Sequence, residues 1–409
     1  MKRYTPAVLG FVFLAATCGR RQVPFELDWT RLVGGVEVRE EGYSVRVTHD
    51  GGFVLGGMTQ TKPTGGYPCP FVVRTNPEGE ILWTQSYQFG GCAVFHVVEQ
   101  TSDGGYIGVG YTEVGVGGRA DCYLVKTDAL GDTLWTRSYG TPELEVAYDV
   151  EELPDRGFLL VGFTNATEDN SHDIWLVRTD AEGRMVWNRT YGGNMDDVGY
   201  RVQRTQDGGF AVAGYRDGGF VPGYVVELTA LLKDSCQAYL LKLDSLGEVE
   251  WEKTYGGPKP EAVMDAMQLW DGGYILAGLT RSNTAGQDDV YAVRTDRVGD
   301  TLWTFTIGGT DIDVAYSVDT TPSGGFILFG RTDSFEADSA GQKVRHKNAL
   351  YAVELDRSGK VLWTWPFAVG FSDIGYCVRR APGGGYVLSG AAVDRSINDV
   401  EAFLSRITP

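Results

Sequence analysis

The chain has 409 residues, of which 43% are hydrophobic and 12% aromatic, with 56 glycines and a formal net charge of −18. This apolar content is enough for a packed interior and argues against intrinsic disorder. The negative charge argues against nucleic-acid phosphate or an anionic membrane surface as a direct partner, because both would be repelled.

The first 17 residues resemble a secretory signal peptide. Lys2 and Arg3 precede an apolar run, residues 7–16, that is too short to span a bilayer. Residues 14–18 resemble a bacterial lipobox, which predicts a lipid on Cys18. Ordinary cleavage after Thr17, followed by simple secretion, is the alternative.

The expected organisation is a signal peptide (1–17), a short tether (18–24) and one folded domain (25–409). The protein is then extracytoplasmic, either secreted or held in the cell envelope, and touches a membrane only through an N-terminal lipid.

One sequence pattern returns every 52 to 64 residues and predicts a repeat architecture. In each copy an Asp or Asn stands seven residues before a Trp, and a Gly stands four before it. Trp29 lacks the preceding Asp and Gly. The Trp residues are Trp29, Trp83, Trp135, Trp187, Trp251, Trp303 and Trp363.

Each repeat is interpreted as four short antiparallel strands. Asp-Gly-Gly or a similar turn, as at Asp271, joins the first two strands, because Asp and Gly tolerate the positive φ of tight turns. A further Gly lies inside each second strand, for example Gly278, and the neighbouring repeat's Trp is expected to pack against it. The Trp rings are expected to be buried between repeats.

Seven such units predict an all-β, seven-bladed β-propeller of four-stranded antiparallel blades. The last repeat ends after the strand 401–407, and the strand that it lacks is present at the other end of the chain, around Trp29. Pairing of these two segments would complete the last blade and leave no free sheet edge.

The Asp-x-x-Gly-x-x-x-Trp pattern resembles the tryptophan-docking motif of the quinoprotein-like (PQQ-like) propellers, and the Asp-Gly-Gly-aromatic hairpin resembles bacterial secreted β-propeller repeats. The resemblance covers residues 25–407. Quinoprotein dehydrogenases are similar but have eight blades and adjacent cysteines, which this chain lacks. The resemblance therefore implies a fold and disfavours a quinone-dependent dehydrogenase.

The two longest insertions, residues 216–237 and 333–348, lie on the face opposite the uniform turns, where binding is expected. The first is apolar and is interpreted as folding back over its own blade, with a binding surface as the alternative. The second is basic and is interpreted as a solvated loop tip, with binding again as the alternative. Their candidate binding residues are Phe220, Tyr224, Arg345 and His346.

Six of the seven units carry an acid three residues before the large residue of the innermost strand. These acids are expected at the mouth of the central channel on the variable-loop face, either as hydrogen-bond acceptors at the corners between blades or as an electronegative site. They are Glu40, Glu145, Asp197, Glu261, Asp313 and Asp373.

No catalytic or metal-binding signature is present in the sequence, so neither a catalytic residue nor a metal ligand is assigned, and no cofactor is expected; calcium is the one ion considered. Beyond Cys18 there are five cysteines, and none of them forms a Cys-x-x-Cys pair of the kind found in metal or redox sites. One or two disulfides among them are possible.

We expect a monomeric, non-enzymatic binding or scaffold module for a protein or glycan partner. The alternative is a polysaccharide hydrolase or lyase, which should show two or three channel acids that break the sevenfold repeat.

Overall fold

The computed structural model describes residues 25–35, 38–61, 66–88, 90–114, 119–219, 236–284, 286–339, 342–345, 348–394 and 399–408. These residues form strands and turns and contain no helix. None of the described elements is therefore a helix that could cross a membrane.

Four-stranded antiparallel sheets follow one another along the chain. The first unit is β2 (Val38–Val47), β3 (Phe53–Thr61), β4 (Cys69–Thr75) and β5 (Ile81–Ser86). The second is β6 (Ala93–Gln100), β7 (Tyr106–Thr112), β8 (Asp121–Thr127) and β9 (Thr133–Tyr139). The third is β10 (Glu145–Glu152), β11 (Phe158–Thr164), β12 (Asp173–Thr179) and β13 (Met185–Tyr191).

The later units repeat this order. The fourth is β14 (Asp196–Arg204), β15 (Phe210–Gly218), β16 (Gln237–Leu243) and β17 (Val249–Tyr255). The fifth is β18 (Glu261–Gln268), β19 (Tyr274–Thr280), β20 (Asp289–Thr295) and β21 (Thr301–Ile307). The sixth is β22 (Asp313–Thr320), β23 (Phe326–Thr332), β26 (Ala349–Leu355) and β27 (Val361–Phe367), with the small hairpin β24 (Glu336–Ser339) and β25 (Gln342–Arg345) beside β27.

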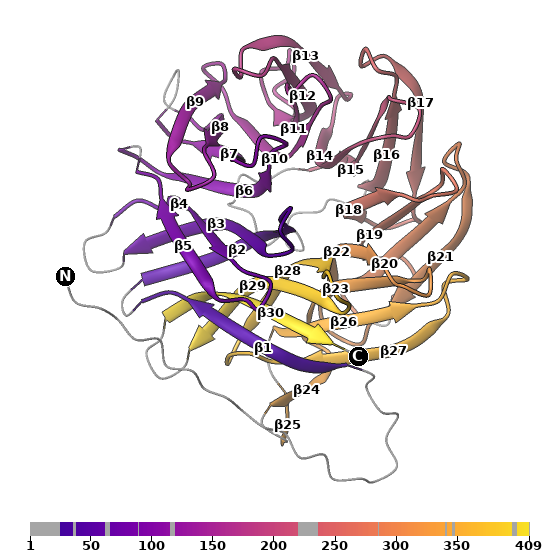
Figure 1. The fold of residues 1–409 in the computed structure, drawn as a ribbon. Helices are drawn as coiled ribbons and strands as arrows, with labels where there is room; N and C mark the ends of the chain where they lie inside the picture. The colour runs from indigo at the N-terminus through magenta and orange to yellow at the C-terminus, as the bar shows by residue number, and fades with distance from the viewer. Residues whose placement is uncertain are drawn as a thin grey trace, which may run out of the picture.

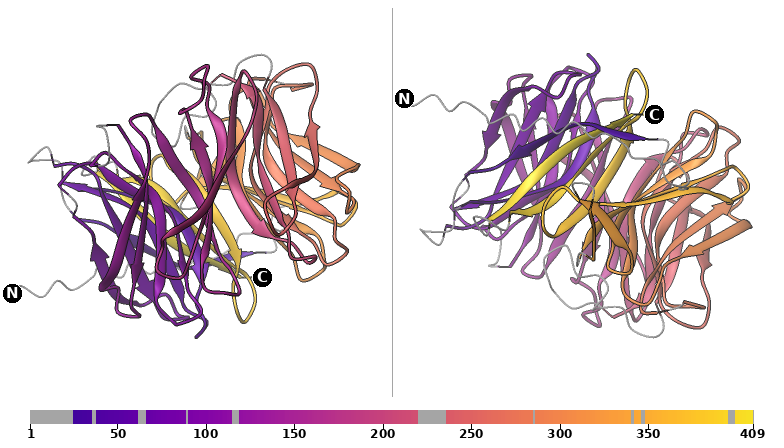
Figure 2. Two further views of the ribbon diagram at one scale, coloured as in Figure 1. Left: turned by 90° about the horizontal axis from the view of Figure 1, so that it is seen from above. Right: turned by 90° about the horizontal axis from the view of Figure 1, so that it is seen from below.

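The last sheet combines both ends of the chain. β28 (Asp373–Arg380), β29 (Tyr386–Asp394) and β30 (Asp399–Thr408) are followed in space by β1 (Glu26–Val33). β1 pairs antiparallel with β30, and Leu32 lies opposite Phe403. The expected pairing of the Trp29 segment with the C-terminal strand is therefore present, and Figures 1 and 2 show β1 beside β30.

The sheets are arranged around a common axis (Figure 1). The first strand of each unit contacts the first strand of the next, in the order β2, β6, β10, β14, β18, β22 and β28, and β28 in turn contacts β2. Apolar side chains of adjacent units fill the space between them in separate clusters, such as the one between the second and third units around Leu124, Val150 and Leu160.

Tight turns close one face of the ring. In the second unit Gly104 adopts a φ of 84°, and the carboxylate of Asp103 accepts the N–H of Gly105. A basic residue of the third strand then binds the hairpin aspartate, as Lys126 binds Asp103 at 3.0 Å. The same pair recurs as Arg74–Asp50, Arg178–Asp155, Lys242–Asp207 and Arg294–Asp271. In the sixth unit Ser323 replaces the aspartate and Glu354 replaces the base, so both partners of the ion pair are lost together.

The Trp rings dock where the sequence analysis did not place them. A Cβ on Gly299, in the Asp-x-x-Gly turn of the fifth unit, would lie 2.6 Å from the ring of Trp251 in the fourth. Trp29 meets Gly79 of the first unit in the same way, across the junction of the chain ends. The remaining contacts of this kind are Trp83 with Gly131, Trp135 with Gly183, Trp187 with Gly247 and Trp303 with Gly359.

Two expectations about these residues are therefore wrong. Six of the seven Trp side chains are half-buried, and Trp363 alone among them is buried. The glycine inside each second strand contacts a main-chain carbonyl instead of a Trp: a Cβ on Gly278 would meet the oxygen of Ala262 at 1.9 Å. Packing between units decides the first outcome, and the pairing of the first two strands within a unit decides the second.

Trp363 differs because the last two strands of the last sheet, β30 and β1, are not connected by an Asp-x-x-Gly turn as the equivalent strands of the other sheets are. Phe25, just before β1, takes that place, with its ring 5.3 Å from Trp363 and 5.6 Å from Tyr386. This extra aromatic covers Trp363 and explains its burial.

Candidate functional site

The six predicted acids are all buried at the corners between units. The carboxylate of Glu145 accepts bonds from the N–H and hydroxyl of Thr141 and from the hydroxyl of Thr164. Asp373 accepts the N–H groups of Val369 and Gly370, both at 2.8 Å. The other four bind equivalent groups: Glu40 binds Thr59, Asp197 binds Gly193 and Asp217, Glu261 binds Gly257 and Thr280, and Asp313 binds Gly309, Thr332 and Ser334.

These bonds hold the chain at the corners, and burial still affects the titration of some of the acids. Burial raises the pKa of Glu40 and of Asp373 to about 7, although the hydroxyl of Thr59 and the two N–H groups, respectively, oppose the shift. The carboxylates accept bonds from the neighbouring backbone and hydroxyls, except that Oε2 of Glu40 is buried without a hydrogen-bond partner in the described residues. The acids consequently stabilise the corners and do not form an open site.

Each innermost strand has a β-bulge at the large residue that follows the corner, as at Tyr148, which falls between Ala147 and Asp149 in the register. The bulged side chains pack on one another in one cluster. The rings of His96 and Tyr148 stack 4.8 Å apart, and Tyr43 and Tyr376 meet edge to face at 5.2 Å. The bulged residues are Tyr43, His96, Tyr148, Tyr200, Met264, Tyr316 and Tyr376.

His96 is neutral in this cluster. Its Nδ1 lies 2.7 Å from the carbonyl oxygen of Ala147, which sets Nδ1 as the donor. Burial lowers its pKa to about 4. The aromatic cluster therefore carries no imidazolium charge at neutral pH.

Charged side chains follow immediately after three of the bulges, and here the repeat is broken. Arg201 binds Asp149 at 2.8 Å and approaches Asp265 at 3.5 Å, and Arg379 binds Asp265 at 3.1 Å. Burial alone would raise the pKa of Asp265, but the charges of Arg379 and Arg201 outweigh it and lower the pKa. For Asp149 burial prevails, and its pKa is raised despite Arg201.

Sequence analysis missed this group of charges. The signal was available, because the residue after the bulge is Asp, Arg, Asp in the third to fifth units but Ser, Val, Ser and Cys elsewhere. Asp149 and Asp265 are the symmetry-breaking acids that a hydrolase would require. However, each accepts an arginine and a backbone N–H, from Val202 and Val318 respectively. They are engaged in holding adjacent units together.

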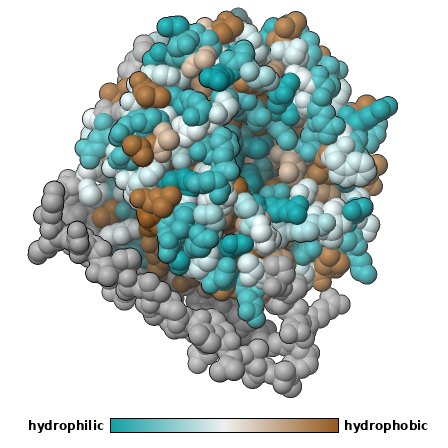
Figure 3. Space-filling view, viewed as in Figure 1, coloured by the Kyte–Doolittle hydropathy of each residue, from teal (hydrophilic) through white to brown (hydrophobic). Residues whose placement is uncertain are grey.

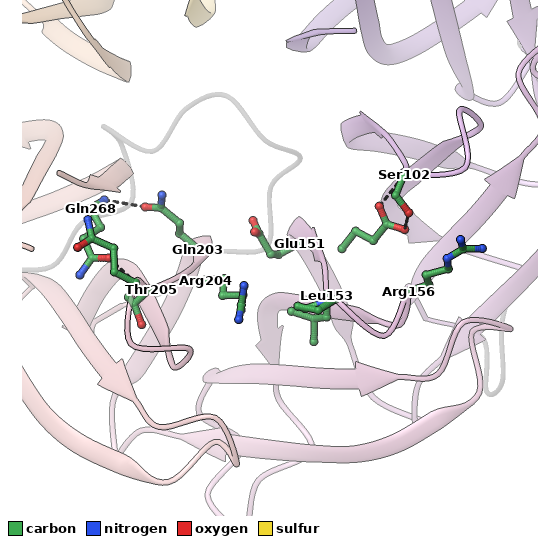
Figure 4. Close-up of a pocket in the computed structure, with 11 residues that line it drawn as sticks. Ser102, Glu151, Leu153, Arg156, Gln203, Arg204, Thr205 and Gln268 are labelled. Carbon is green, nitrogen blue, oxygen red and sulfur yellow. Dashed lines mark hydrogen bonds between the residues drawn. The ribbon is translucent and has the colours of Figure 1, made fainter. Parts of the chain in front are cut away.

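A polar cavity of about 590 Å³ opens on the face of the tight turns, where β10, β14 and β18 end. It lies opposite the face on which binding was expected. Figure 4 shows Glu151 and Arg204 in its middle, with Ser102 and Gln268 at either side. The lining residues are Ser102, Glu151, Glu152, Leu153, Pro154, Arg156, Gln203, Arg204, Thr205, Gln206 and Gln268.

Most of the lining is held in place by hydrogen bonds. Gln203 accepts the N–H of Gln268 at 2.7 Å, and Glu152 accepts both the N–H and the hydroxyl of Ser102. Burial and then the charge of Glu99 raise the pKa of Glu151 to about 7. The cavity is thus a preformed polar site whose one perturbed carboxyl is partly protonated at neutral pH.

Several predicted site residues lie outside the described part of the chain: Cys18, Phe220, Tyr224 and His346. Arg345 is at the end of β25, where its backbone pairs with Glu336. The structure therefore leaves the two candidate binding loops as predictions.

Within the described residues, all five cysteines are free thiols, and four of them are buried. No group of three or more His, Cys, Asp or Glu side chains in that part of the chain is arranged to hold a metal ion. The surface seen in Figure 3 is mainly hydrophilic, with apolar residues scattered singly or in small groups.

The sequence matches no protein-family model and no curated protein. Solved structures do match. YCF48 bound to D1 peptide has a TM-score of 0.52 at 10% identity, covering 95% of this chain and 98% of that one. The Pan2 WD40 domain of Neurospora crassa has a TM-score of 0.50 at 9% identity, covering 89% and 88%.

Puromycin hydrolase also has a TM-score of 0.50, at 14% identity, and the match covers 88% of this chain but 53% of the hydrolase. At such identities a likeness shows the fold alone. The chain has an all-β, propeller-type fold of four-stranded antiparallel sheets, which is consistent with a binding or scaffold module.

Proposed function

We propose that this protein is a monomeric seven-bladed β-propeller, closed by β1, that acts outside the cytoplasm as a non-enzymatic binding module for a protein or glycan partner. After the signal peptide is removed, a lipid attached to Cys18 would anchor the protein in the cell envelope. The cyclic contacts of the innermost strands from β2 to β28 support the blade count. The pairing of β1 with β30 supports the closure.

The polar cavity at the end of β10, β14 and β18 carries the proposal of binding. It is concave, preformed and lined by side chains that hydrogen bonds already fix, which lowers the entropy cost of binding a partner. The propeller-type structure of YCF48 was solved with a peptide bound, which supports a peptide as one kind of partner for such a fold.

Binding is favoured over polysaccharide hydrolysis by what the acids do. A glycosidase requires two carboxyl groups free to act on opposite sides of the sugar bond. In the cavity Glu152 accepts bonds from Ser102, and on the innermost strands Asp149 and Asp265 are ion-paired with Arg201 and Arg379. Glu151 is then a single carboxyl without a second one to complete the pair.

Comparative affinity capture tests this proposal. The mature protein, a Gln206→Trp variant that narrows the cavity and a Thr310→Trp variant at an exposed corner on the other face are each incubated with envelope extract. We expect the wild type and Thr310→Trp to retain the same protein or glycan, and Gln206→Trp to lose it. Equal retention by all three, or release of reducing ends from polysaccharide, would contradict the proposal.

A further inference from the structure

The hairpins on the turn face are joined to one another by a repeated hydrogen bond. At three junctions between units, the residue before the hairpin aspartate donates its N–H to a side chain at the end of the next unit's innermost strand. This bond links His49 to Gln100 at 2.8 Å, Ser102 to Glu152 at 2.7 Å and Gln206 to Gln268 at 2.8 Å.

Between the third and fourth units this bond cannot form, and Pro322 and Arg380 exclude it between the sixth and seventh units in the same way. At the first of these junctions the donor position is Pro154, which has no N–H, and the acceptor position is Arg204, which has no acceptor atom. Both residues line the cavity. The cavity therefore opens at one of the seams between units that lack this bond.

Arg156 is a departure from the repeat that occurs at this seam alone. It has a φ of 64°, in the left-handed region, whereas the equivalent residue in the other six units is glycine. An L residue is strained in this conformation, and retained strain of this kind is a pointer to function. Arg156 and Arg204 are both exposed, and neither guanidinium has an ion-pair or hydrogen-bond partner in the residues that the structure describes.

An exposed aromatic stands beside the cavity. Trp270 is 84% exposed at the tip of the β18–β19 hairpin. The side chain of Gln206 donates to the carbonyl of Leu269 at 2.8 Å, which fixes this tip next to the cavity lining. Trp and Arg are the residue types most enriched among those that dominate protein–protein binding energy.

We propose that the cavity binds an acidic segment of a protein partner, with a carboxylate of that segment between Arg156 and Arg204 and an apolar side chain against Trp270. This inference rests on the proposed binding function and names its ligand class. Arg156 and Arg204 are not ion-paired within the described part of the chain, although Glu151 and Glu152 line the same cavity. Because the protein is strongly acidic overall, these two arginines would select where such a segment docks. Glu152 is held by Ser102, which leaves the guanidinium groups available.

Selection from a displayed library of random peptides of about twelve residues tests the inference on the mature chain. We expect the enriched peptides to contain Asp or Glu together with an apolar residue. Their affinity should fall about tenfold or more in Arg204→Ala and in Trp270→Ala. Raising the salt concentration should weaken the binding, because part of it is electrostatic.

The chain offers matched controls. Arg380 is exposed and occupies the position of Arg204 in the last unit, next to Pro322, but it does not line the cavity. Leu246 is 66% exposed at an outer turn. Arg380→Ala and Leu246→Ala should leave peptide binding unchanged, and all four variants should unfold at the wild-type temperature.

The outcomes separate this inference from the proposed function. If the selected peptides bind equally to the wild type and Arg204→Ala, or lack acidic residues, the ligand class is wrong while binding stands. If heparin binds the cavity in an Arg204-dependent way and no peptide does, the partner is an anionic glycan and the inference is overturned. If neither probe binds and affinity capture also fails, the proposed function is wrong as well.

Discussion

The contact between each Trp and the turn of the next unit can be tested with a single methyl group. A Cβ added at Gly299 would lie 2.6 Å from the ring of Trp251, and the carbonyl of Gly299 also accepts the hydroxyl of Tyr255 at 2.8 Å. Gly299→Ala should therefore displace the ring as well as place an L residue at a φ of 81°. The left-handed conformation costs about 1–2 kcal/mol, and overpacking adds about 1–3 kcal/mol.

Gly104 separates the two effects. It has a φ of 84°, but a Cβ there would meet no atom within 4 Å, so Gly104→Ala should show the conformational cost alone. Urea unfolding followed by circular dichroism measures both variants, with unchanged slopes as the condition for comparing midpoints. Gly299→Ala should be the less stable by about 1–3 kcal/mol, and a difference below about 0.5 kcal/mol would refute the docking argument.

Three further changes test other parts of the account. Cys18→Ser should move the protein from the membrane to the soluble fraction and abolish labelling by fatty acid; equal solubility of both forms would exclude the lipid anchor. Trp29→Ala should destabilise the protein as much as Trp187→Ala, by about 2–3 kcal/mol because both rings are half-buried, and deletion of residues 19–33 should cause aggregation by exposing β30; a monomeric deletion variant with an unchanged melting transition would contradict closure by β1. Burial and Glu99 raise the pKa of Glu151 to about 7 from 4.5, so its contribution to stability is present below the lower value and is lost as pH rises through the upper one. The Glu151→Gln variant should thus lose less stability than the wild type between about pH 5 and about pH 8, as measured by thermal melting. Parallel curves of melting temperature against pH for the two proteins would show that Glu151 does not titrate in this range.

Local chemistry explains which features could be predicted from the sequence. Aspartate and glycine at Asp103 and Gly104 specify a tight turn by themselves, so the hairpins were predictable. The pairing of β1 with β30 was also predictable, because the last repeat visibly lacks one strand.

Features that depend on how units meet could not be predicted in the same way. The glycine that receives Trp251 belongs to the next unit, and only the geometry between the sheets identifies Gly299. The opening at Pro154 likewise depends on knowing that Arg204 faces it across the seam. The loops that carry Phe220, Tyr224 and His346 remain predictions, because they lie outside the described residues.

Site-specific photo-crosslinking in the producing cell tests most directly the claim that the turn face binds the partner. A photoreactive phenylalanine analogue replaces either Pro154, which is exposed at the cavity, or Thr310, which is exposed at a corner on the other face. Pro154 should give a discrete crosslinked adduct on illumination, and Thr310 should give none. An adduct from Thr310 and none from Pro154 would place binding on the variable-loop face and contradict the account.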